Sequence, residues 1–137
     1  MLEDFIEVNS VNAEIVPGRF SENSARCVLL LSKETGGSPV LAIVPGGKRL
    51  SLEKAARAAG SGELREASEK EDFEVTGYKH GFLPPISIYG VKVLVEKALL
   101  KKPVLNFLVK EECTLRIAPQ TIMEFNEDVL ECSLLED

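Results

Sequence analysis

The stretch VLAIVPGGKRLSLEKAARAAG, residues 40–60, predicts a strand, a glycine turn and a helix in direct succession. Its apolar start is typical of a buried strand, and the PGG that follows interrupts it. Ser51 is a favourable N-cap and Gly60 a favourable C-terminal stop, so we expect a helix between them. Its expected apolar stripe is made of Leu52, Ala55, Ala56 and Ala59. Because three of these residues are alanines, the helix can pack closely against a sheet.

Strands and short helices continue on both sides of this stretch. The segment ARCVLLLS, residues 25–32, predicts a buried strand that forms a hairpin with the strand after it. Short helices are expected near residues 2–8, after the capping-box pattern SEKE at 68–71, and at PQTIMEF. Further strands are expected at 13–16, 63–68, 91–95, 103–109, 113–118 and 128–135. This order predicts a single α+β (mixed α/β) domain over residues 1–137, with a curved mixed sheet and three to four short helices.

Charge is distributed unevenly along the chain. The net charge is −6, but the last 18 residues hold six acids and no base. Residues 75–119 carry seven bases against three acids, so this segment is locally +4. It can present a basic face to a polyanion such as a nucleic acid, or its lysines are ordinary solvated surface residues. The sequence leaves both interpretations open.

The three cysteines, Cys27, Cys113 and Cys132, are widely spaced among apolar residues, which predicts free and partly buried thiols. No CxxC pair is present and one histidine cannot complete a zinc set, so we expect no metal. A cysteine nucleophile would need His80 nearby in space. No apolar run approaches the length of about 20 residues that spans a membrane, and the N-terminus is acidic. We therefore expect a cytoplasmic protein without membrane contact.

The segment TGYKHGFLPP, residues 76–85, contains the only histidine of the chain, His80. Gly81 can adopt a positive φ or bring its N–H close to a ligand carbonyl. Pro84 and Pro85 stiffen the end of the segment and disfavour helix before it. Such a loop is suited to form a fixed pocket wall, and it is equally a rigid connector.

These segments, in this order, resemble the YbaK / prolyl-tRNA-synthetase-associated editing-domain family. The resemblance rests on VLAIVPGGKRLSLEKAARAAG, LREASEKEDFEVTGY, TGYKHGFLPP and VKVLVEKALL, and it covers the chain from about residue 26 onward. It implies a barrel-like sheet and hydrolysis of mischarged aminoacyl-tRNA, without a metal or another cofactor. The implied partner is the aminoacylated 3′ end of tRNA, and an aminoacyl-tRNA synthetase is a second candidate partner.

The resemblance also implies a set of site residues. Arg26 stands where the family has a lysine, and with Gly81 it is expected to place the scissile carbonyl. The predicted substrate-binding residues are Thr76, Gly77, Tyr78, His80, Phe82, Pro84 and Pro85. Glu96, at a strand end where the family often has an aspartate, is expected to orient neighbouring backbone.

Three departures from the family pattern weigh against an unchanged active site. Arginine stays charged and cannot act as a general base, although its planar fork can hold a carbonyl oxygen or a phosphate. Residues 17–25 are too few for the helix that the family has before the lysine strand, and residues 106–115 lack the family's glycine turn. The alternative is therefore a non-catalytic module that binds tRNA, a nucleotide or a protein on the same fold.

Overall fold

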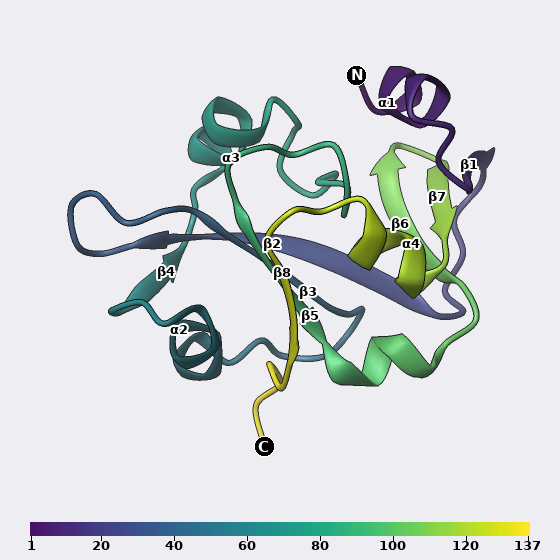
Figure 1. The fold of residues 1–137 in the computed structure, drawn as a ribbon. Coiled ribbons are helices and arrows are strands. Elements are labelled where there is room, and N and C mark those ends of the chain that lie inside the picture. The colour runs from purple at the N-terminus through teal and green to yellow at the C-terminus, as the bar shows by residue number, and fades with distance from the viewer.

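The computed structural model describes all residues, 1–137, as one mixed sheet with short helices around it (Figure 1). The strands are β1 (Ala13–Pro17), β2 (Ser24–Ser32), β3 (Val40–Pro45), β4 (Leu64–Glu66), β5 (Lys92–Glu96), β6 (Leu105–Lys110), β7 (Cys113–Ile117) and β8 (Val129–Cys132). The helices are α1 (Leu2–Val8), α2 (Leu52–Ala59), α3 (Glu69–Thr76) and α4 (Pro119–Glu124), with a 3₁₀ helix η1 (Lys97–Lys101).

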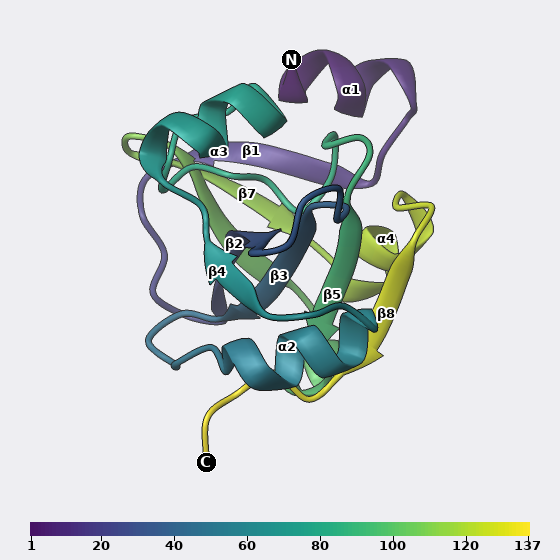
Figure 2. The same cartoon turned by 90° about the vertical axis from the view of Figure 1, so that its left-hand side faces the viewer.

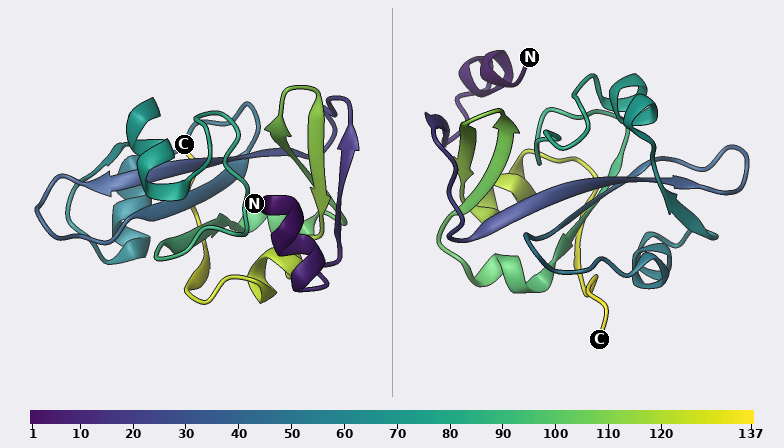
Figure 3. Two further views of the ribbon diagram at one scale, coloured as in Figure 1. Left: turned by 90° about the horizontal axis from the view of Figure 1, so that it is seen from above. Right: turned by 180° about the vertical axis from the view of Figure 1, so that it is seen from behind.

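The strands form an eight-stranded sheet in the order β1-β7-β6-β2-β3-β5-β8, with β4 paired to β2 outside this path. The pairs β6–β2, β3–β5 and β5–β8 are parallel and the others are antiparallel. Figure 3 shows β1, β7 and β6 together at one end, with the long strand β2 running from them toward the other end. The predicted fold class, a curved mixed sheet in an α+β domain, is confirmed, as is the β2–β3 hairpin.

Two strands, β6 and β4, pair with the same edge of β2, and a part of that edge between them is unpaired. β6 pairs with β2 only at Ser24 and Ala25, and β4 pairs with it only from Leu30 to Ser32. Between these two short ladders, residues 26–29 have no ladder partner on this edge. The break matters because an uncovered strand edge offers backbone N–H and C=O groups to a ligand.

The helix ends follow the predicted capping residues. The Ser51 side chain accepts a hydrogen bond from the N–H of Lys54 at the start of α2, and Gly60 ends the helix with a φ of 67°. Ser68 and Glu71 form the predicted capping box of α3. Figure 2 shows α2 on one side of the sheet, with α1 and α3 on the other.

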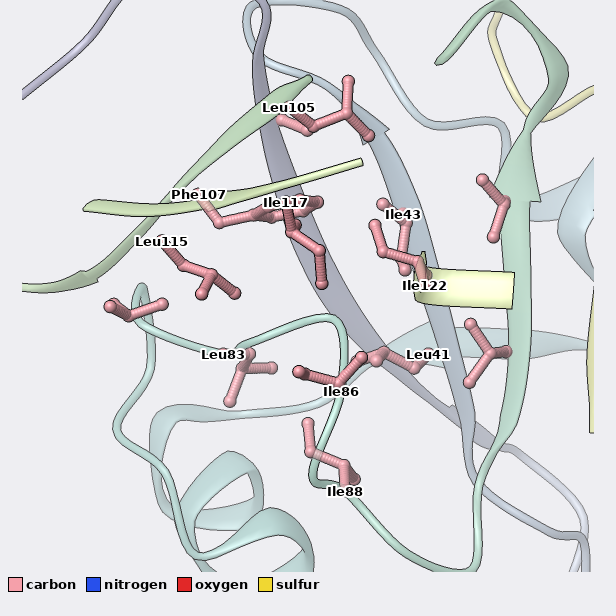
Figure 4. Close-up of a cluster of buried hydrophobic side chains, with 14 of the residues drawn as sticks. Leu41, Ile43, Leu83, Ile86, Ile88, Leu105, Phe107, Leu115, Ile117 and Ile122 are labelled. Carbon is pink, nitrogen blue, oxygen red and sulfur yellow. The ribbon is translucent and has the colours of Figure 1, made fainter. Parts of the chain in front are cut away.

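The larger of two buried apolar clusters lies inside the curved sheet (Figure 4). β3, β6 and β7 supply side chains such as Leu41, Phe107 and Leu115, each at most 1% exposed. The segment that follows α3 adds Leu83, Ile86 and Ile88, all buried. The cluster therefore holds this segment in place through its apolar residues, which leaves the polar residues before it at the surface.

Glu96 is a buried acid, only 3% exposed, at the end of β5. Its carboxylate accepts the N–H of Ala98 at 2.7 Å and the N–H of Leu134 at 2.9 Å. It thereby caps η1 and fixes the chain after β8. The predicted orienting function of this side chain is confirmed.

One expectation about a surface was wrong, and one question about a surface was left open by the sequence. Leu52 does not belong to the buried stripe of α2, because as the first helical residue it lies at the rim and is 37% exposed, whereas Ala55 is fully buried. The open question was whether the bases of residues 75–119 form one face, and the structure distributes them over the loop after α3, β5, η1, β6 and β7. Lys110 pairs with Glu3 at 2.6 Å, and Arg116 lies over the ring of Phe20. The green helical turn at the bottom of Figure 1 is η1, which lies on the side of the sheet away from α3.

None of the helices has the length and apolar character needed to cross a membrane.

Candidate functional site

A cavity of about 340 Å³ opens at the break in the edge of β2. β2 contributes residues 25–29 to its wall. One side is formed by Phe107 and Leu108 of β6, and the other by Glu66 and Ala67 at the end of β4. Asp72 of α3 and the loop residues His80, Gly81 and Leu83 complete it. The cavity is large enough for a small ligand, and its mostly apolar wall suits an uncharged side chain.

The β2 edge gives this cavity a polar backbone strip. Leu29 turns its carbonyl toward the break, where it accepts the N–H of Ala67 at 2.9 Å. Alternate residues of a strand direct their backbone groups to the same edge, so those of Cys27 face the break as well. A ligand in the cavity can therefore meet backbone hydrogen-bonding groups on an otherwise apolar wall.

The end of α3 fixes the loop above the cavity. The Thr76 hydroxyl donates to the Asp72 carbonyl at 2.7 Å and accepts the N–H of Tyr78 at 3.0 Å. Gly77 ends the helix with a φ of 80°, which glycine adopts without steric cost. The Tyr78 hydroxyl forms a hydrogen bond with the hydroxyl of Ser87 at 2.8 Å. These contacts hold the loop at both ends.

Gly81 occupies the third position of a tight turn. The Phe82 N–H donates to the Lys79 carbonyl at 3.0 Å, and Gly81 has a φ of 87°, as the third residue of a type II turn requires. The space where a Cβ would stand is empty. The N–H of Gly81 donates to no acceptor within the protein. This N–H is thus available to a ligand.

His80 and Asp72 form a hydrogen-bonded pair on the same wall. Nδ1 of His80 lies 2.6 Å from Oδ2 of Asp72, and this is the one hydrogen bond that the Asp72 carboxylate makes. The Asp72 side chain is 5% exposed and the His80 side chain 54% exposed. Burial raises the pKa of the Asp72 carboxyl, and the hydrogen bond from His80 opposes that rise.

Arg26 lies on the cavity wall, but its guanidinium is engaged elsewhere. Nη2 donates to the carbonyl of Lys48, in the turn before α2, at 3.0 Å. The Arg26 side chain is exposed. Its strand neighbours Ala25 and Cys27 pack with the larger core cluster, so Arg26 projects from the opposite face of β2. A bond from the guanidinium to a ligand carbonyl would require it to leave Lys48.

Cys27 stands next to Arg26 and packs against the larger core cluster. Burial alone raises the pKa of its thiol. A thiol of this kind stays protonated and is a poor nucleophile. The cysteine is therefore a small apolar part of the wall.

The structure brings together three of the predicted site residues, Arg26, His80 and Gly81. The other six support the loop away from the cavity wall. Thr76 and Tyr78 make the hydrogen bonds described above, and the two prolines are buried beneath the loop. The binding functions assigned to these six, Thr76, Gly77, Tyr78, Phe82, Pro84 and Pro85, stay predictions.

Sequence reasoning missed Asp72, and it considered Cys27 only as one of three cysteines that would need His80 nearby to act as a nucleophile. Asp72 belongs to a run of acids in the first turn of α3, which is the usual pattern of a solvated helix start. Its position one helical turn before Thr76, at the start of the loop, was the available signal. The structure does place Cys27 and His80 on one cavity, but burial raises the pKa of the thiol, which disfavours it as a nucleophile.

A second and more open groove of about 980 Å³ lies between the β2–β3 loop, the end of α2 and the chain after α4. Acidic side chains dominate its charged residues, among them Glu124, Glu127 and Asp128. It contains neither Gly81 nor the His80–Asp72 pair. The smaller cavity is thus the better candidate site.

The chain belongs to the aminoacyl-tRNA editing domain family, whose model matches residues 13–125. No curated protein sequence matches it. Among solved structures, a candidate trans-editing enzyme for prolyl tRNA synthetase superposes with a TM-score of 0.83 at 20% identity, over 99% of this chain and 95% of that one.

Two other solved structures show the same fold. A hypothetical protein superposes with a TM-score of 0.84 at 20% identity, over 98% of this chain and 99% of that one. A protein from work on epitope backbone grafting onto scaffolds superposes with a TM-score of 0.85 at 18% identity, over 99% of this chain and 95% of that one. At these identities the likeness establishes the fold alone.

Proposed function

We propose that the protein is an aminoacyl-tRNA deacylase that hydrolyses the ester of mischarged tRNA in trans, in the cytoplasm. Membership of the editing-domain family supports the substrate class. The observation that carries the proposal is the cavity that unites the Gly81 turn with the open edge of β2. An aminoacyl group at the 3′ end of tRNA is the ligand, and an aminoacyl-tRNA synthetase is a candidate partner that would supply the mischarged tRNA.

Gly81 has the principal catalytic function in this proposal. Its free N–H, in a turn held by the Lys79–Phe82 bond, can donate to the oxygen that becomes negatively charged as water attacks the ester. Arg26 is a second donor if its guanidinium exchanges the Lys48 carbonyl for the substrate. The apolar part of the wall would accept the amino-acid side chain.

The test is deacylation of a panel of mischarged tRNAs by the purified chain, with Gly81→Ala and Gly90→Ala as matched variants. Both glycines have a positive φ, 87° and 74°, and open space where a Cβ would stand, but only Gly81 lines the cavity. Each alanine strains its turn by about 1–2 kcal/mol. Alanine keeps the backbone N–H, but its Cβ disfavours the φ of 87° and should move the N–H away from the substrate oxygen. We therefore expect Gly81→Ala to lose about 10-fold in rate, part of the about 100-fold or more that a single oxyanion donor contributes. Gly90→Ala should keep the rate.

A non-catalytic binding module on the same fold is the second candidate, and the Arg26–Lys48 bond favours it. In that case the guanidinium is structural and the protein binds tRNA ends without turnover. Binding of the same panel without loss of ester would favour the module, and Arg26→Lys, which restores the family lysine, is then expected to create activity. Ester hydrolysis by the wild type above the uncatalysed rate would exclude it.

A further inference from the structure

The His80–Asp72 pair is placed to do more than shape the cavity mouth. Asp72 is buried on α3, and His80 stands on the loop eight residues later, beside Gly81. A carboxylate that accepts from Nδ1 fixes the tautomer in which the other ring nitrogen, Nε2, carries a free lone pair. Nε2 makes no hydrogen bond within the protein.

We propose that His80 is the general base of the deacylation, and that Asp72 is its positioning residue. The proposal rests on the proposed function and adds the group that activates the water. The imidazole is half exposed, so water reaches it, and it belongs to the same wall as the Gly81 N–H. One short turn thus supplies a base for the water and a donor for the carbonyl oxygen.

The step balances as an ordinary ester hydrolysis. Nε2 of His80 takes a proton from water while the water oxygen bonds to the ester carbonyl carbon. The bond between that carbon and the terminal ribose oxygen then breaks, and the imidazolium returns the proton to the ribose oxygen. The products are the free tRNA end and the amino acid, whose new carboxyl group releases its proton to solvent.

The surroundings of the pair suit this assignment. The hydrogen bond brings the imidazolium formed in the step against a carboxylate, which stabilises its charge. The other charged groups that act on Asp72 are Glu66 and Glu71, and Glu71 is already held by Arg65 at 2.8 Å. Cys27 faces the same cavity from β2 as a neutral thiol. His80 is therefore the group on this wall that is placed to take a proton from the water.

The experiment measures deacylation by the intact chain, His80→Gln, Asp72→Asn and the control Glu74→Gln, against the mischarged tRNA that the wild type hydrolyses fastest. Glutamine at 80 can still donate to Asp72, so the buried carboxylate keeps a partner while the base is lost. Glu74 is an exposed acid of the same helix and undergoes the same acid-to-amide change as Asp72.

We expect His80→Gln to lower kcat about 100-fold or more, with KM little changed. Asp72→Asn should lower kcat on the order of 10-fold. Glu74→Gln should match the wild type. The pH profile of the wild-type rate should change in both His80→Gln and Asp72→Asn, because each removes one member of the pair, and it should stay the same in Glu74→Gln. Circular dichroism checks that each variant folds.

Different results separate this proposal from the proposed function. Deacylation by the wild type together with more than a third of that activity in His80→Gln overturns the base and leaves the deacylase standing. A wild type that leaves every ester intact overturns both. If His80→Gln does not fold, Asp72→Asn provides the test. An unchanged kcat and an unchanged pH profile in Asp72→Asn would refute the positioning function of Asp72 and, with it, the assignment of His80 as the base.

Discussion

Replacing Glu96 by glutamine tests whether a buried carboxylate joins two distant parts of the chain. Glu96 accepts two backbone N–H groups, from Ala98 and Leu134, and is 3% exposed. A hydrogen bond to a charged group contributes about 1.5–3 kcal/mol. The amide keeps one acceptor oxygen and sets its NH₂ against the other N–H, so one bond is lost. We expect Glu96→Gln to lower the free energy of unfolding by about 2–3 kcal/mol.

The assay is urea unfolding followed by circular dichroism at neutral pH. A loss of this size moves the midpoint by about 1 M or more to lower urea, because small proteins lose about 1–3 kcal/mol per molar urea. Glu131→Gln is the control, since Glu131 is exposed on the neighbouring strand β8, and it should change the free energy of unfolding by less than about 0.5 kcal/mol. A loss below about 1 kcal/mol in Glu96→Gln, or an equal loss in Glu131→Gln, would refute the reasoning.

Two further predictions concern the core and the pH dependence of stability. Leu94 is fully buried and its strand partner Leu130 is 42% exposed, so Leu94→Ala should cost about 3 kcal/mol and Leu130→Ala less than about 1 kcal/mol in urea unfolding. Arg65 holds the pKa of Glu71 at about 2, below its ordinary value of 4.5, so the stability from this pair is present above pH 4.5 and is lost as pH falls toward 2. As pH is lowered from 4.5 to 2, the melting temperature of Arg65→Met should fall less steeply than that of the wild type. Parallel curves of melting temperature against pH for the two proteins would contradict this.

The sequence predicted the local structure well because each local signal has a local physical cause. The N-cap at Ser51, the capping box at Ser68 and the stop at Gly60 satisfy helix ends with groups a few residues away. The turn at Gly81 likewise depends on its own backbone angle. Leu52 was wrongly predicted to be buried, because periodicity indicates which face of a helix is apolar but not at which residue of that face the packing begins.

The candidate site could be predicted only in part. Resemblance to the family directed attention to Arg26 and Gly81, and the structure places both on one cavity. It could not show that the Arg26 guanidinium bonds to Lys48, because that contact depends on the path of a turn 22 residues away. Asp72 was missed because an acid in the first turn of a helix is usually exposed.

The sequence by itself determined the strands, the helices, their caps and the shape of the loop around Gly81, since these follow from side-chain periodicity and backbone preferences over a few residues. Only the tertiary structure decided that β6 and β4 meet the same edge of β2 and leave a break between them. Pairing of Leu30 with Glu66, 36 residues further on, and of Ser24 with Asn106, 82 residues further on, created that break. The packing of Leu83 and Ile86 into the core placed the loop with His80 beside it. The cavity is thus a product of long-range packing, which no local pattern of residues encodes.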